Sequence, residues 1–187
     1  MFIGSYFVNE LLKKLGSVRH CPKGTFLFRQ GERGGNLFFI QSGLVKAYYE
    51  TLDGKEFIKS FVTEGEFIAS MQSTVAGNPN SFTVLSLEDS VVIDVPKQAV
   101  LNLVTNNPGL TDVLNTMLLK LAMKKERREY ELLCMSPEER YLLFCEREAR
   151  LLERLSQNDI ARYLGITPVA LSRIRRRVGF LKDRPHA

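Results

Sequence analysis

The hydrophobic pattern changes its period at Pro96, and this change constrains the fold more than any other feature of the sequence. Before Pro96, short runs of β-branched and aromatic residues alternate with glycine-containing turns, which is typical of strands. Asp53-Gly54 lies between two such runs and is a strong hairpin signal. After Pro96 the apolar residues recur at helical spacing. We therefore expect an α+β chain whose small antiparallel barrel or jelly roll precedes its helices. The expected strands are Thr25–Phe28, Leu37–Ile40, Leu44–Thr51, Lys55–Val62, Phe82–Ser86 and Val91–Val95.

A long helix is predicted soon after the barrel. Lys97–Thr105 forms a first helix, and Pro108 suits the first turn of a second helix that runs to about Cys134. This second helix carries an apolar stripe that needs a partner surface. The stripe either packs on the chain's own barrel or forms a self-complementary dimer seam, and we favour the dimer. The seam residues are Leu110, Val113, Leu114, Met117 and Leu121. A short amphipathic helix, Ser5–Leu15, is predicted before the barrel.

The net charge of +5 is concentrated at the C-terminal end of the chain. Residues 151–187 hold eight Lys and Arg against three Asp and Glu, whereas residues 1–107 are neutral overall. A basic module on a neutral body suggests a polyanionic partner. Nucleic acid is the first candidate and an anionic membrane surface the second, while a merely solvated basic tail is the alternative to both.

A helix, a turn and a second helix can be read between residues 155 and 178. Ser156 is the expected cap of the first helix, and Gly165 is the residue expected to turn the chain with a positive φ. Thr167 is the expected cap of the second helix, with Pro168 in its first position. This is the helix-turn-helix pattern. The expected core residues are Ile160, Ala161, Leu164, Ile166, Leu171 and Ile174.

The second helix, about Pro168–Val178, has a basic outer face that can lie in the major groove of DNA. Arg173 is expected near base edges, where an arginine reads guanine O6 and N7, and Arg175 and Arg177 are expected at the flanks, near phosphates. A helical hairpin with a solvated basic face is the alternative. The complete set of predicted DNA-binding residues is Thr167, Ser172, Arg173, Arg175, Arg176 and Arg177.

Nearly the whole chain resembles the bacterial transcription regulators typified by the catabolite activator protein and the fumarate–nitrate regulator, the Crp/Fnr type. The residues that carry the resemblance are the helix-turn-helix together with Lys23-Gly24-Thr25, Gln30-Gly31-Glu32, Leu37–Gly43 and Gly65-Glu66-Phe67-Ile68. The resemblance implies a double-stranded β-helix of the cyclic-nucleotide-binding kind at 1–107, a dimerisation helix at 108–135 and a DNA-binding domain at 136–187. It also implies double-stranded DNA, a second copy of the chain and RNA polymerase as candidate partners.

The stretch that resembles the family's phosphate-binding cassette departs from the pattern of cyclic-AMP-binding members. Those members use a Glu for the ribose and an Arg-Ser/Thr pair for the cyclic phosphate. Ser70 stands at the Glu position and Asn80 at the Arg position, so only Ser81 matches. Because a phosphate needs a cation or several aligned donors, we expect no response to cyclic AMP. The candidate ligand pocket comprises Phe67, Ile68, Ala69, Ser70, Met71, Asn80, Ser81 and Phe82.

No metal or cofactor is expected from the sequence, and the effector is unknown. Relatives that carry an iron–sulfur cluster use an N-terminal cysteine group, but Cys21 is the only cysteine before residue 134. Haem is disfavoured because His20 and Cys21 are adjacent, and neighbours on a strand point to opposite faces. The three widely spaced cysteines fit reduced thiols.

The sequence contains none of the enzyme motifs that we considered, and no enzyme is expected. No apolar stretch reaches the ~18 residues of a membrane span, and no secretory signal is visible. We therefore expect a cytoplasmic homodimeric transcription regulator. The alternative is a small-ligand or protein-interaction module whose helix-turn-helix has a non-DNA role. The operator, the regulated genes and the sign of regulation are left open by the sequence.

Overall fold

The computed structural model describes the backbone of residues 10–182 and the side chains of residues 10–179. The chain divides into two compact units, residues 1–116 and residues 117–187. The first half of the predicted helix Ser5–Leu15 lies outside the described residues, and residues 10–15 are helical as expected. No helix in the part of the chain that the structure describes is long and apolar enough to cross a membrane.

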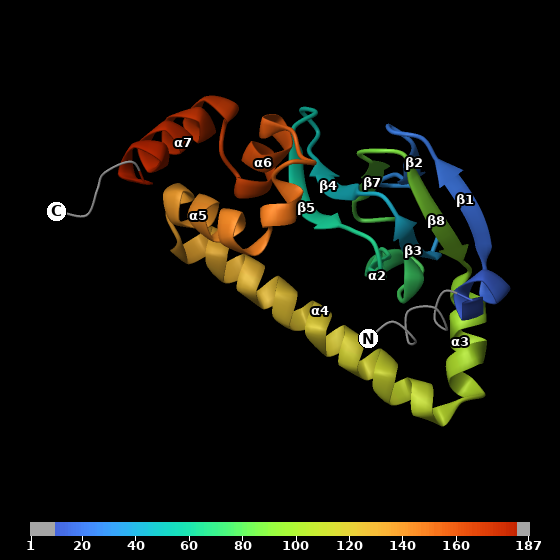
Figure 1. The fold of residues 1–187 in the computed structure, drawn as a ribbon. Coiled ribbons are helices and arrows are strands. Elements are labelled where there is room, and N and C mark those ends of the chain that lie inside the picture. The colour runs from blue at the N-terminus through green and yellow to red at the C-terminus, as the bar shows by residue number, and fades with distance from the viewer. Residues whose placement is uncertain (1–9, 183–187) are drawn as a thin grey trace. The chain divides into compact units, whose positions relative to one another are not determined.

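The first unit contains an antiparallel jelly roll made of two four-stranded sheets (Figure 1). The order in one sheet is β1-β8-β3-β6, and the order in the other is β2-β7-β4-β5. The predicted α+β class with an N-terminal jelly roll is thereby confirmed. The strands are β1 Ser17–Cys21, β2 Phe26–Phe28, β3 Leu37–Ser42, β4 Val45–Glu50, β5 Glu56–Val62, β6 Phe67–Ile68, β7 Thr83–Ser86 and β8 Ser90–Val95. The expected set lacks β6, and only His20 and Cys21 of β1 were treated as strand residues.

Strand alternation places the apolar side chains of the first unit in two cores. The interior of the jelly roll is filled by residues such as Ile40, Val84 and Val92, none of which is accessible to solvent. A second core forms on the outer face of one sheet, where the helical residues 10–15 and helix α3, Lys97–Thr105, cover Phe39 and Ile93. A short helix, α2 Met71–Thr74, follows β6 and was not expected from the sequence.

The hairpin predicted at Asp53-Gly54 is present. Strands β4 and β5 pair in antiparallel register from Val45 with Val62 to Glu50 with Glu56. Gly54 has a φ of 75°, a left-handed conformation that favours glycine. The hairpin signal in the sequence therefore identified both the turn and the two strands that it joins.

The long predicted helix is α4, Pro108–Cys134, and it begins and ends where the sequence indicates. In the second unit it is followed by α5 Pro137–Arg147, the 3-10 turn η1 Ala149–Leu151, α6 Gln157–Leu164 and α7 Pro168–Lys182. Helix α5 begins with a capping box, in which the amide of Glu139 donates to Ser136 and the Glu139 carboxylate accepts from the Ser136 amide. The hydrogen bonds from Ser136 hold the pKa of Glu139 below its usual range.

Candidate nucleic-acid interface

Helices α6 and α7 form a helical hairpin with capped ends and a tight turn (Figure 1). The Ser156 side chain accepts a hydrogen bond of 3.1 Å from the amide of Asp159, and the Thr167 side chain accepts one of 3.2 Å from the amide of Ala170. Gly165 ends α6 with φ 70° and ψ 32°, and its amide donates back into the last turn of α6. These contacts confirm the predicted caps and turn, which fix where each helix begins and ends.

The core of this hairpin consists of the apolar residues that the sequence indicated. Ala161 is fully buried, which lets the two helices approach closely. The other buried residues are Ile160, Leu164, Leu171 and Ile174, and Ile166 is half-buried. The inward positions of α7 are thus filled by apolar side chains, and its polar side chains are left on the outer face.

The four arginines of α7, Arg173, Arg175, Arg176 and Arg177, are exposed, and two of them contact helix α5. A nitrogen of Arg177 lies 3.1 Å from a carboxylate oxygen of Glu138. Arg175 hydrogen-bonds with Tyr141, whose pKa is raised, chiefly by burial. No ion pair is found for Arg173 or Arg176 among the described residues 10–179. The four arginines therefore occupy two settings: Arg175 and Arg177 lie against α5, whereas Arg173 and Arg176 form no ion pair within the described part of the chain.

Of the predicted pocket residues, the structure brings one pair close together inside the jelly roll. Ser70 and Ser81 lie 3.4 Å apart by their hydroxyl oxygens, and the Ser81 amide donates to the Ser70 hydroxyl at 3.2 Å. Asn80 is buried, and its backbone pairs with the turn at Gly31 and Glu32. The Ser70 hydroxyl is therefore already engaged, and Asn80 supplies no charge.

The remaining pocket residues do not share one surface. Ile68 and Phe82 lie in the interior core, whereas the Phe67 ring packs on Phe39 in the outer core, with ring centroids 4.8 Å apart. Ala69 is half-buried and Met71 is exposed on α2. The alternation of side chains along β6 is the reason, since Phe67 and Ile68 are neighbours on a strand.

One cation beside this region was missed by the sequence reasoning. The Lys59 ammonium of β5 lies 4.6 Å from the centre of the Phe82 ring, which also meets the Tyr49 ring edge-on at 6.2 Å. Lys59 is distant from Ser81 in the sequence, and no local motif joins them. The contact arises because β4 pairs with both β5 and β7, and Phe82 directly precedes β7.

The predicted seam residues lie on α4 and are only partly covered. Val113, Met117 and Leu121 are exposed to 54%, 42% and 37%, respectively, and Leu110 and Leu114 are half-buried. Apolar side chains with this exposure on one helix face are available to a partner surface. The dimer itself stays a prediction, as do the predicted domain boundaries.

The comparisons with known proteins found one matching domain family and several similar transcription regulators. The cyclic nucleotide-binding domain family matches residues 18–107. The fumarate and nitrate reduction regulatory protein of Vibrio cholerae is 29% identical over 180 residues, covering 89% of this chain and 70% of that protein. Over most of its length this chain is therefore similar to transcription regulators of the Crp/Fnr type.

Solved structures of the Crp/Fnr kind have the same fold as this chain. The c-di-GMP responsive regulator CLP of Xanthomonas campestris superposes with a TM-score of 0.79 at 17% identity, covering 97% of this chain and 96% of that one. FixK2 of Bradyrhizobium japonicum gives 0.78 at 18% identity, covering 92% and 88%. The neuropathy target esterase sws of Drosophila willistoni is also 29% identical, but over 59% of this chain and only 8% of its own length. This match spans 117 residues and leaves most of the esterase unmatched.

Proposed function

We propose that this chain is a DNA-binding transcription regulator that acts as a homodimer, with α7 lying in the major groove. The observation that carries the proposal is the capped hairpin of α6 and α7, with Arg173 and Arg176 exposed on its outer face and in no ion pair with the described residues 10–179. An exposed arginine near the start of a recognition helix can read guanine through its fork of donors. The kinship with the fumarate and nitrate reduction regulatory protein supports the same role.

Within this proposal the two settings of the arginines correspond to two roles. Arg173 and Arg176 read base edges, with Ser172 beside them. Arg175 and Arg177 contact phosphates, because their contacts with α5 hold them toward the flank of α7. Arg177 of the pair with Glu138 is 65% exposed, so the pair contributes at most about 1 kcal/mol and yields to a phosphate at small cost.

The homodimer follows from the needs of the recognition helix. A single helix-turn-helix reads only one half-site, and two-fold dimers read two half-sites about one helical turn apart. The stripe of exposed apolar residues on α4 supplies a surface for this association, including Met117 and Leu121. A seam of this kind also removes apolar side chains from water.

For the sensor, we propose that cyclic AMP is not the effector. The Ser70 hydroxyl is engaged by Ser81, and the buried Asn80 offers neither a charge nor a fork of donors. Loss of two charge-assisted hydrogen bonds, at about 1.5–3 kcal/mol each, weakens binding by on the order of 10²- to 10⁴-fold. The chain then either responds to a different ligand or binds DNA without a ligand.

Arginine-to-alanine variants test the groove assignment. On a duplex that the wild-type chain selects, Arg173→Ala should lose about 1–3 kcal/mol of binding free energy and relax the preference at one position. Arg177→Ala should weaken all duplexes alike and lower the salt slope by about one. Arg150→Ala, an exposed arginine of η1, is the control and should bind like the wild type. Wild-type affinity of Arg173→Ala for the selected duplex would show that the groove assignment is wrong.

A further inference from the structure

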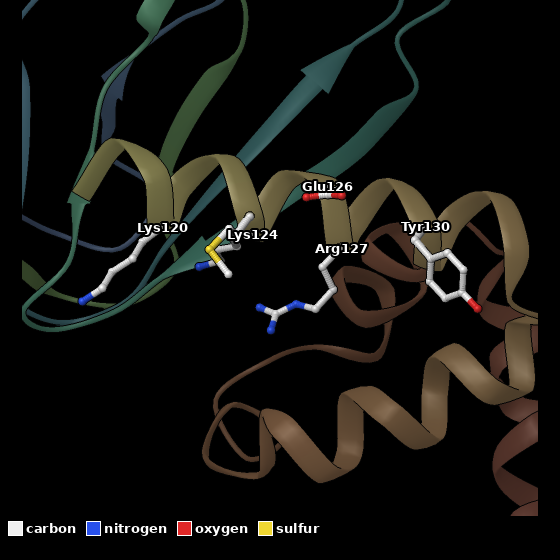
Figure 2. A pocket seen from close by; sticks show the side chains of 6 residues that line it. Lys120, Lys124, Glu126, Arg127 and Tyr130 are labelled. Atoms are coloured by element: carbon white, nitrogen blue, oxygen red, sulfur yellow. The ribbon is translucent and has the colours of Figure 1, made fainter. Parts of the chain in front are cut away.

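Two adjacent arginines of α4 lie in opposite environments. Arg127 is exposed and lines an open groove with Lys120, Lys124 and Tyr130, where Figure 2 shows its side chain extending away from the helix. The side chain of Arg128 is only 16% exposed. Because the two residues have the same chemistry and the same helix, the difference points to a specific contact made by Arg128.

That contact is with the first helix of the helix-turn-helix. The Arg128 guanidinium donates a hydrogen bond to the main-chain carbonyl of Tyr163, and its central carbon lies 3.9 Å from the centre of the Tyr163 ring. Tyr163 lies in the last turn of α6, where the helix itself supplies few amide donors to the carbonyls and a positive charge is favoured. Burial raises the pKa of Tyr163, with Arg128 acting in the opposite direction, so the ring stays neutral beneath the guanidinium.

Further charged groups join the same end of α4 to α5. Glu131 lies 3.5 Å from Arg128 and 2.7 Å from Arg147 of α5, and its side chain is 12% exposed. Arg140, also of α5, donates to the main-chain carbonyls of Leu132 at 3.2 Å and Met135 at 2.9 Å. The last turn of α4 is thus held to α5 by Arg140 and Arg147, and to α6 by Arg128.

We propose that Arg128 is a positioning residue that fixes the helix-turn-helix relative to α4 and so sets the half-site spacing that the dimer reads. This inference rests on the proposed function. The seam residue Leu121 lies seven residues before Arg128, about 10 Å along the same helix. A two-fold dimer binds half-sites at one separation. The strength of its preference for that separation depends on how rigidly each recognition helix is held to the seam.

The role requires an arginine and is not met by a positive charge alone. A planar guanidinium can stack on the Tyr163 ring while its fork serves both the Tyr163 carbonyl and Glu131. The lysine ammonium of Arg128→Lys is a compact point charge, which keeps the ion pair and loses the stacking and the fork. Arg128→Lys therefore separates the positioning role from the charge.

The experiment measures spacing preference with three full-length variants, Arg128→Lys, Arg128→Met and the matched control Arg127→Lys. Each is titrated, well below its unfolding temperature, with duplexes that carry two selected half-sites at the selected spacing or one base pair closer or farther apart. A random duplex reports binding that does not depend on spacing. Circular dichroism confirms the fold of each variant, and Arg128→Lys keeps the test available if Arg128→Met does not fold.

The wild type and Arg127→Lys should prefer the selected spacing by about tenfold or more. Both Arg128 variants should reduce this preference to about threefold or less while binding the random duplex as the wild type does. An unchanged spacing preference in folded Arg128→Lys, even with lower thermal stability, would overturn the positioning role. If the wild-type chain binds no duplex at all, the proposed function itself fails, and the positioning role fails with it.

Discussion

Replacing Gly165 with alanine should destabilise the second unit through backbone conformation alone. Gly165 has a φ of 70°, a left-handed conformation that costs a residue with a Cβ about 1–2 kcal/mol. A Cβ built on Gly165 would lie 3.7 Å from a methyl carbon of Leu132, which is ordinary van der Waals contact and adds no clash. The expected loss in free energy of unfolding is therefore about 1–2 kcal/mol. Gly165→Asn should lose less, because asparagine visits this region more readily.

Gly179→Ala is the matched control, and it should shift stability in the opposite direction. Gly179 lies within α7, is not among the glycines with positive φ, and a Cβ there meets no atom within 4 Å. Alanine in a helix is about 0.5–1 kcal/mol more favourable than glycine. The same chemical change should thus destabilise at the turn and stabilise in the helix.

Thermal unfolding followed by circular dichroism measures both effects, with hydrogen exchange assigning each transition to its unit. For a domain of this size, 1 kcal/mol corresponds to a change in Tm of about 4–8 °C. Gly165→Ala should lower the Tm of the second unit by about 4–16 °C, and Gly179→Ala should raise it by about 2–8 °C. Equal stability of the wild type and Gly165→Ala would refute the reasoning, as would a loss at Gly179 as large as that at Gly165.

Three further predictions concern the seam, the sensor and the thiols. Met117→Glu should yield a folded monomer in sedimentation, whereas Leu119→Glu, which lies off the seam stripe, should stay dimeric. A wild-type monomer at micromolar concentration would show that the seam is wrong. Calorimetry should detect no cyclic AMP or cyclic GMP binding at sub-millimolar concentration, and a low-micromolar affinity for either would contradict the sensor proposal. Exposed Cys134 should be alkylated rapidly, whereas Cys21 should be alkylated only on unfolding, because it is buried and burial raises the pKa of its thiol. Comparable alkylation rates of the two thiols would contradict this burial.

The helix-turn-helix could be predicted closely because its signals are local. Ser156, Gly165 and Thr167 act on backbone groups within a few residues of themselves, so their identity nearly determines the caps and the turn. The apolar spacing of Leu171 and Ile174 then determines which face of α7 is buried. The hairpin at Asp53-Gly54 was predictable for the same reason.

Contacts between distant elements could not be predicted from local patterns. Arg128 lies in a run of charged residues that reads as a solvated helix face, and only the position of Tyr163 in space distinguishes it from Arg127. Strand β6 is two residues long, too short for an alternating pattern, so Phe67 was placed in the candidate ligand pocket with Ile68 although it packs in the outer core. Lys59 reaches the Phe82 ring through strand register and not through sequence proximity.

Selection of bound duplexes from a random library tests the central claim most directly, since the operator sequence does not have to be chosen beforehand. The wild-type chain should enrich two inverted half-sites whose centres lie about one helical turn apart. Arg173→Ala should lose the preference at one symmetric position of that site. Recovered sequences indistinguishable from the input library, from a chain that is folded and dimeric, would contradict the claim that this chain reads DNA through α7.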